Sequence, residues 1–215
     1  MNKTNYKNLF DEYVEKNFDN IHKFLNIKLT IFREIQSRIH EISICLIVEA
    51  YTASVTLSNH TLERLLKLAL IKNEILQTGK IGIDKIDYKT PHKNWDGLVL
   101  DKTVKACKEN KLITEEEYKT LNEIRRYFRN GYSHGELNKI LYQYKEEVEM
   151  FKVNINTDEV QPLKINLKET PIWQYILVDE FSKEIAIQYL DFLCILTQNI
   201  EQRIHQKRQD LKLRS

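Results

Sequence analysis

Glycine and proline are scarce in this sequence. The 215 residues include only 5 Gly and 3 Pro, so few positions favour the tight turns that a β-sandwich or β-barrel needs between its strands. Long helices joined by few turns are expected instead. A chain of this length can bury a substantial core within one domain, and we expect a single domain over residues 1–215.

Cysteine pairs, long apolar runs and an excess of one charge are also lacking. Cys45, Cys107 and Cys194 lie far apart and are odd in number, which argues against a disulfide framework or a zinc site and favours reduced core thiols. The apolar run at Ile44–Val48 is too short to span a bilayer. The first residues lack the apolar stretch of a signal peptide, so we expect a cytoplasmic protein with no membrane partner. A formal net charge of +2 gives a weak field, which argues against tight, sequence-blind binding to a long duplex.

Apolar residues recur at helical spacing over the first part of the chain. Helical regions are expected over residues 6–36 and 39–77, and the second is apolar around much of its circumference, as in a central, buried helix. The SNHT sequence at 58–61 offers capping residues that could interrupt this region, and Gly79 suits a helix C-cap. Residues 79–97 then read as a long loop.

The second half of the chain predicts two short helices, a hairpin and a long helix. A short helix is expected over residues 98–110, and TEEE at 114–117 is a capping box that opens the next one. Apolar and polar residues alternate over residues 148–168 around the turn residues NTDE, which predicts a β-hairpin. Apolar residues three or four apart over 181–200 predict a long terminal helix with a basic tail. The fold class is therefore all-α, with a small β-hairpin insertion before the C-terminal helix.

The hexapeptide RNGYSH, at residues 129–134, holds the residues with the clearest chemical potential. Cleavage of RNA without a metal needs a base for the 2′-hydroxyl proton, an acid for the leaving 5′-oxygen and a cation for the phosphorane. His134 suits proton transfer near neutral pH. Arg129 offers a permanent charge in a planar fork that matches phosphate oxygens. Asn130 can orient the imidazole by a hydrogen bond. These three are the candidate catalytic residues.

The spacing of these residues raises a geometrical problem. At about 100° per residue, Asn130 and His134 share one face of a helix, whereas Arg129 and His134 diverge by roughly 140°. Two arrangements would bring the cation and the imidazole together. One is a break of the helix at Gly131, and the other is a two-fold axis that adds the residues of a second copy to the same cleft.

The pattern R-N-x-x-x-H followed by glycine resembles the signature of the HEPN superfamily (higher eukaryotes and prokaryotes nucleotide-binding). Arg129, Asn130 and His134 match its three positions, and Glu63 with Lys67 resembles the ExxxK of the second main helix in many members. The resemblance covers about residues 40–145 plus the terminal helix. It implies a bundle of long antiparallel helices that forms a homodimer or higher homo-oligomer. It also implies a composite cleft and a ribonuclease that leaves a 2′,3′-cyclic phosphate and needs no cofactor.

Members of this superfamily commonly serve as toxins, antiphage abortive-infection effectors or RNA-processing nucleases, so an antitoxin or a defence-system partner is a further expectation. The chain departs from the family in two places. A toxin subgroup has a tyrosine two residues after the histidine, where this chain has Glu136, so control by AMP transfer at that tyrosine is not implied. Residues 148–168 have no counterpart in the minimal bundle.

Several neighbours of the motif are candidate supporting or RNA-binding residues, each with a simpler reading. Glu63 and Lys67 either orient the catalytic groups or form an ordinary i,i+4 pair. Tyr132 either stacks on a base or packs with its hydroxyl bonded. Ser133 either contacts phosphate or lies on the helix surface.

Arg126, with Arg125, either widens the phosphate-binding surface or pairs with Glu123 and the acidic residues at 115–117. The other histidines have no metal-ligand spacing, and we predict no metal site. These histidines, which lie outside the motif, are His22, His40, His60, His92 and His205. A metal-dependent nuclease would need clustered carboxylates that the sequence does not offer.

The prediction is thus a metal-independent endoribonuclease acting on RNA. The alternatives are a non-catalytic HEPN-like module that binds a nucleotide, an RNA or a protein, and a helical scaffold in which the hexapeptide occurs by chance.

Overall fold

The computed structural model describes residues 2–78, 87–135, 137–153 and 159–214. Within these ranges the chain is mostly helical, with one two-stranded antiparallel sheet before the last helix, which confirms the predicted helical class and the predicted hairpin. The helices are α1 (Lys3–Leu25), α2 (Arg33–Ile47), α3 (Tyr51–Gln77), α4 (Lys89–Trp95), α5 (Leu100–Glu109), α6 (Glu115–Ile124), α7 (Asn130–His134), α8 (Leu137–Ile140) and α9 (Pro171–Arg214). A π-helical segment, η2 (Arg125–Arg129), joins α6 to α7, and a 3₁₀ turn, η3 (Leu141–Gln143), follows α8.

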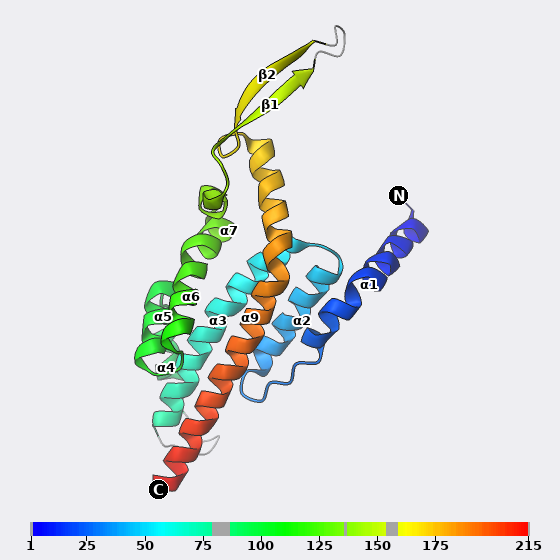
Figure 1. The fold of residues 1–215 in the computed structure, drawn as a ribbon. Helices are drawn as coiled ribbons and strands as arrows, with labels where there is room; N and C mark the ends of the chain where they lie inside the picture. Colours follow the sequence, from blue (N-terminus) through cyan, green and yellow to red (C-terminus); the bar gives the residue numbers. More distant parts are fainter. Residues whose placement is uncertain (1, 79–86, 136, 154–158, 215) are drawn as a thin grey trace.

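Helix α9 runs along the whole body from the hairpin to the C-terminal end, with α3 beside it (Figure 1). Hydrogen bonds join Thr52 to Ser182, Asn59 to Tyr189 and Asn73 to Lys207. Because the residue numbers of the bonded partners increase in the same direction along both helices, α3 and α9 are parallel. Contacts of Asn17 with Ile47 and of His40 with Leu25 show that α1 and α2 are antiparallel. The expected antiparallel packing therefore holds for the first helices and is wrong for the pair α3–α9.

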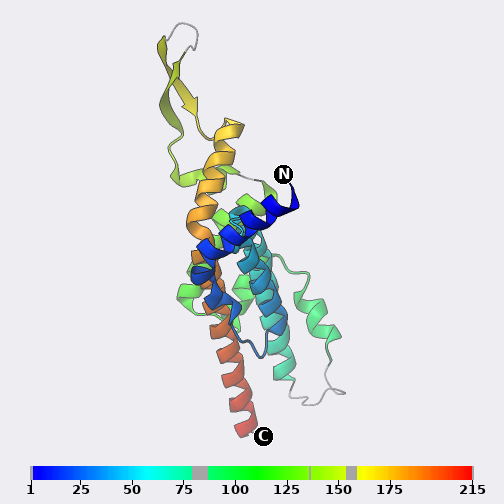
Figure 2. The ribbon, with the colours of Figure 1, turned by 90° about the vertical axis from the view of Figure 1, so that its right-hand side faces the viewer.

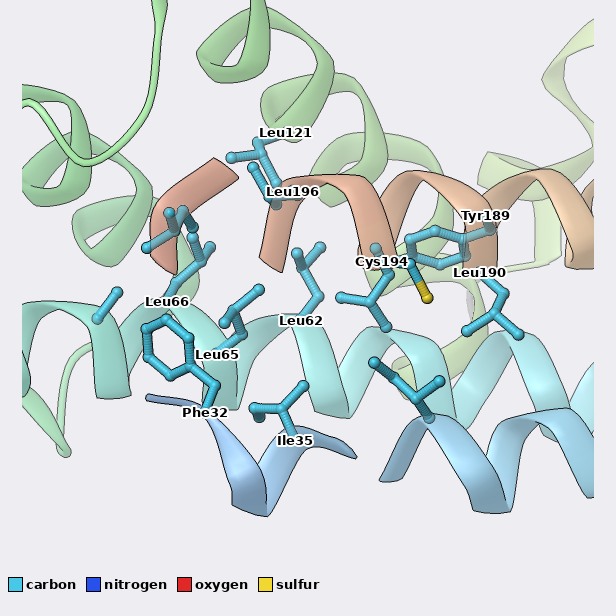
Figure 3. Packing of buried hydrophobic residues seen from close by; sticks show 14 of the residues in the cluster. Phe32, Ile35, Leu62, Leu65, Leu66, Leu121, Tyr189, Leu190, Cys194 and Leu196 are labelled. Carbon is cyan, nitrogen blue, oxygen red and sulfur yellow. The ribbon is translucent and has the colours of Figure 1, made fainter. Parts of the chain in front are cut away.

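The core lies where α2, α3, α6 and α9 meet (Figure 3). Helix α3 contacts α2, α4, α5 and α9, which explains why its sequence is apolar around most of its circumference. Each fully buried Leu, Ile or Phe contributes about 1.5–3 kcal/mol relative to an exposed one. Side chains of this core with almost no exposed surface are Phe32, Ile35, Leu62, Leu65, Leu66 and Leu121. Among the described residues, Cys107 and Cys194 are buried, Cys45 is partly exposed, and all three are free thiols.

The first helix boundary differs from the prediction. The chain leaves the helix at residues 26–32, not at 37–38, and α2 runs through the predicted break. Leu29 and Phe32 of this connection are buried, so it carries apolar residues as a helix would. The carboxylate of Glu201 on α9 accepts hydrogen bonds from the amides of Thr30, Ile31 and Phe32. A distant side chain therefore fixes the connection that leads into α2.

Two further predictions about helix ends are wrong. SNHT at 58–61 does not interrupt α3, because Ser58 and Asn59 are buried against other helices and Asn59 accepts a hydrogen bond from Tyr189. The predicted loop at 79–97 contains α4, whose first amides are bonded to the carboxylate of Asp87. The predicted helix at 98–110 is confirmed as α5. The predicted C-cap at Gly79 lies outside the described residues.

The hairpin pairs β1 (Glu147–Val153) with β2 (Val160–Asn166), from Glu147 opposite Asn166 to Val153 opposite Val160. Its predicted turn at 156–159 lies largely outside the described residues. Both views show the hairpin extending beyond the helical body, next to the first turns of α9 (Figures 1 and 2). In the described part of the chain, no helix has both the length and the apolar content needed to cross a membrane. The single domain over residues 1–215 stays a prediction.

Candidate active site at the RNGYSH helix

The candidate motif stands at the end of one helical rod that starts at residue 114. Thr114 accepts a hydrogen bond from the amide of Glu117, and Glu117 accepts one from the amide of Thr114, which confirms the predicted capping box. The rod continues through α6, η2 and α7 and ends at Gly135, whose backbone is left-handed with φ +68°. Glycine adopts this conformation without the steric cost that other residues incur.

The irregularity of this rod is not at Gly131. Gly131 is buried inside α7, and the expected break there is wrong. The backbone instead widens into the π-helical segment η2, which ends at Arg129. A π-helical segment hydrogen-bonds i to i+5 and often marks a functional site. It changes the phase of the following turn, so it sets the direction in which Arg129 and Asn130 leave the helix.

Arg129 meets the predicted ExxxK pair of α3. Its Nη2 lies 3.5 Å from Oε2 of Glu63, and Oε1 of Glu63 lies 3.1 Å from Nζ of Lys67. The side chains of Arg129, Glu63 and Lys67 are 26%, 21% and 15% exposed. This partial burial makes the pairs less screened than exposed ones. One carboxylate thus lies between two cations, so these three side chains together carry a net positive charge. We call Glu63, Lys67 and Arg129 the cationic cluster.

The other predicted residues of the motif are placed to different extents. Asn130 is half-buried at the first position of α7. The hydroxyl of Tyr132 lies 2.7 Å from Oγ of Ser182 on α9, and burial raises the pKa of Tyr132 to about 12. This is the geometry of a packed tyrosine with its hydroxyl bonded. The side chains of Ser133 and His134 lie outside the described part of the structure, so the approach of His134 to Arg129 stays a prediction.

The two arginines before the motif do not pair with the acidic cluster of α6. Arg125 lies 2.9 Å from Asp101 of α5, while Glu117 binds Arg203 of α9 instead. Arg126 is exposed, and its guanidinium carbon lies 6.0 Å from the centre of the Tyr127 ring. Arg126 is therefore placed where a phosphate outside the helix could reach it.

An aromatic groove, which no sequence pattern predicts, lies on the other flank of the same helix. It has a volume of about 440 Å³ and lies between the rod formed by α6 and η2, the turn η3 and helix α9. Its lining residues are Thr120, Glu123, Ile124, Tyr127, Phe128, Tyr142, Ile185, Gln188, Tyr189 and Phe192. The aromatic residues come from three separate segments of the chain, so no local pattern indicates that they share a groove.

The described residues contain no group of three or more histidine, cysteine, aspartate or glutamate side chains that could hold a metal ion. In comparisons with protein-family models, with curated proteins and with solved structures, nothing matches this chain.

Proposed function

We propose that the protein is a metal-independent endoribonuclease of the HEPN type, which acts on single-stranded RNA as a homodimer. The observation that carries this proposal is the contact of Arg129 with Glu63, which is itself paired with Lys67. These residues come from two sequence motifs, RNxxxH and ExxxK, that are far apart in the chain. A chance hexapeptide on a helical scaffold has no reason to meet the second motif of the same family.

The chemistry assigned to each residue follows from its side chain. Arg129 binds the scissile phosphate and stabilises the charge of the phosphorane. His134 transfers a proton to or from the reacting oxygens, and Asn130 orients the imidazole. Glu63 and Lys67 are positioning residues, because Glu63 holds the guanidinium from the side and Lys67 adds positive charge near the anionic substrate. The expected product has a 2′,3′-cyclic phosphate.

The second copy of the chain enters because of the helix geometry. The backbone from Asn130 to His134 is α-helical, so the chain has no break at Gly131. At about 100° per residue, positions 129 and 134 of such a helix lie roughly 140° apart around its axis. Of the two arrangements that would unite them on one phosphate, a two-fold axis is favoured. Such a nuclease would suit a toxin or an antiphage effector, whose activity an antitoxin or another defence protein would restrain.

The test is cleavage by the purified protein in the presence of EDTA. We expect single-stranded RNA to be cut with 2′,3′-cyclic phosphate ends, and His134→Ala and Arg129→Ala to lower the rate by about 10²–10⁴-fold. The matched controls are His60→Ala and Arg208→Ala, since both residues are exposed and outside the motif. Cleavage by His134→Ala at the wild-type rate would refute the assignment. Binding of RNA without any product would favour the non-catalytic binding module.

A further inference from the structure

The aromatic groove is built as a site for a flat ring. The rings of Tyr127 and Tyr142 are stacked, with centroids 4.2 Å apart and planes 20° apart. Tyr189 and Ile124 are buried, so the floor of the groove is apolar. Tyr142 is 52% exposed and forms an accessible edge. Aromatic faces that are open on one side are the surfaces on which unstacked nucleobases bind.

The rim of the groove adds hydrogen-bonding groups to this apolar floor. Glu123 of α6 and Gln188 of α9 are exposed and line it from opposite elements. A carboxylate only accepts hydrogen bonds, whereas an amide both donates and accepts. An apolar, aromatic pocket with a few polar groups at its edge is the general form of a small-ligand site, and a volume of about 440 Å³ lies in the range of such sites.

The groove and the cationic cluster lie on opposite flanks of one helical rod. Arg126 belongs to the same π-helical segment as Tyr127 and Arg129. Arg126 is exposed, and its guanidinium lies near the Tyr127 ring. A single strand that crosses the rod can therefore place one phosphate at Arg129, the next stretch of backbone on Arg126 and a base in the groove. The helix is about 10 Å wide, so this base would neighbour the scissile phosphate and not be attached to it.

We propose that this groove is a base-binding subsite, in which one unstacked nucleobase of the RNA stacks on an outer face of the Tyr127–Tyr142 pair. The proposal rests on the proposed function, since it assigns the substrate's neighbouring base to a place beside the same helix. The carboxylate of Glu123 selects bases that carry an exocyclic amino group, because these donate to it. Uracil has no such group and binds more weakly than cytosine or adenine.

The experiment measures binding separately from cleavage. Short fluorescent RNA oligomers of A, C or U carry 2′-O-methyl groups, which remove the attacking hydroxyl, and their affinity is followed by fluorescence anisotropy. Tyr142→Ala is expected to weaken binding about tenfold, as loss of a stacking side chain does, whereas Tyr142→Phe keeps the ring and binds like wild type. Tyr175→Ala is the matched control, because Tyr175 is 73% exposed and lies outside the groove. Glu123→Gln is expected to reduce the preference for A and C over U.

The possible results separate this proposal from the proposed function. If Tyr142→Ala binds all oligomers as tightly as wild type while unmodified RNA is still cleaved, the subsite is wrong and the nuclease stands. If Tyr142→Ala binds more weakly but the wild-type protein cleaves no RNA, the subsite stands and the nuclease falls. If Tyr142→Ala changes the oligomeric state on size-exclusion chromatography and not the affinity, the groove is covered by a second copy and the subsite is wrong. A second pair of variants tests the rim of the groove: Gln188→Ala lies within the groove, and Gln198→Ala, its control, lies at an exposed position of α9. Weaker binding of the oligomers by Gln188→Ala alone supports the subsite.

Discussion

The guanidinium of Arg129 lies 3.5 Å from the carboxylate of Glu63, a residue of a different helix. The same carboxylate holds Lys67 at 3.1 Å, so its charge is shared between two cations. A guanidinium paired with a carboxylate on another helix is restricted in its orientation. In the proposed nuclease, this restriction positions Arg129 before the substrate arrives.

Glu63→Gln should therefore lower the rate of RNA cleavage without unfolding the protein. We expect kcat to fall about 10- to 100-fold, as for a misplaced catalytic group, with a smaller change in KM and an unchanged melting temperature. Glu109→Gln is the matched control, since Glu109 forms an exposed i,i+4 pair with Lys105 at 3.9 Å. Steady-state kinetics of both variants check this prediction, and equal rates for Glu63→Gln and wild type would contradict it.

The start of the motif helix depends on Glu117. Its carboxylate accepts two hydrogen bonds from Arg203, at 2.7 and 3.0 Å, one from Asn199 and one from the amide of Thr114. Burial alone would raise the pKa of Glu117, but these hydrogen bonds and the charge of Arg203 hold it below its ordinary value. Glu117→Gln should cost about 2 kcal/mol of unfolding free energy at neutral pH, whereas Glu116→Gln at an exposed position should cost little.

The stabilisation by Glu117 should also depend on pH. Because its pKa is lowered by folding, the contribution is complete above the ordinary carboxyl pKa of about 4.3. It is lost as the pH falls through the lowered folded value. The difference in unfolding free energy between wild type and Glu117→Gln, measured by urea denaturation, should therefore shrink as the pH falls below about 4. A difference that stayed constant down to pH 2 would show that the charge of Glu117 is not the cause.

Gly135 ends the motif helix with a left-handed backbone. A Cβ at Gly135 or at Gly97 would meet no atom within 4 Å, and only Gly135 has a positive φ, at +68°. Gly135→Ala should thus destabilise the protein by about 1–2 kcal/mol through backbone strain alone. Gly97→Ala should change stability little or raise it by about 0.4–1 kcal/mol. Thermal unfolding of both variants checks the pair, and equal effects would contradict the role of φ.

The sequence predicted those parts of the fold that local chemistry determines. Thr114 and Glu117 form a capping box because the two residues satisfy each other's backbone groups within one turn. The alternation over 148–168 likewise marks a hairpin whose register follows from its own strands. The boundary between α1 and α2 could not be found this way. Its connection is apolar like a helix, and the side chain that binds the amides of this connection, Glu201, comes from the far end of the chain.

The same distinction applies to the candidate site. The residue types and their spacing single out Arg129 and His134, and the ExxxK pattern singles out Glu63. The contact between Arg129 and Glu63 depends on how α3 packs against the motif helix, and no pattern within either segment contains it. The break expected at Gly131 was wrong because the glycine is buried in a regular turn, whereas the irregular backbone lies at residues 125–129, which contain no glycine.

The proposed mechanism requires Arg129 of one copy and His134 of the other to act on a single phosphate. The most direct test mixes two inactive proteins, Arg129→Ala and His134→Ala, after co-refolding so that subunits exchange at random. Half of the dimers are then mixed, and each mixed dimer retains one complete site, so cleavage should return to about a quarter of the wild-type rate. If the mixture stays as inactive as either variant alone, although mixed dimers form, the two residues do not act across a dimer and the composite site is wrong.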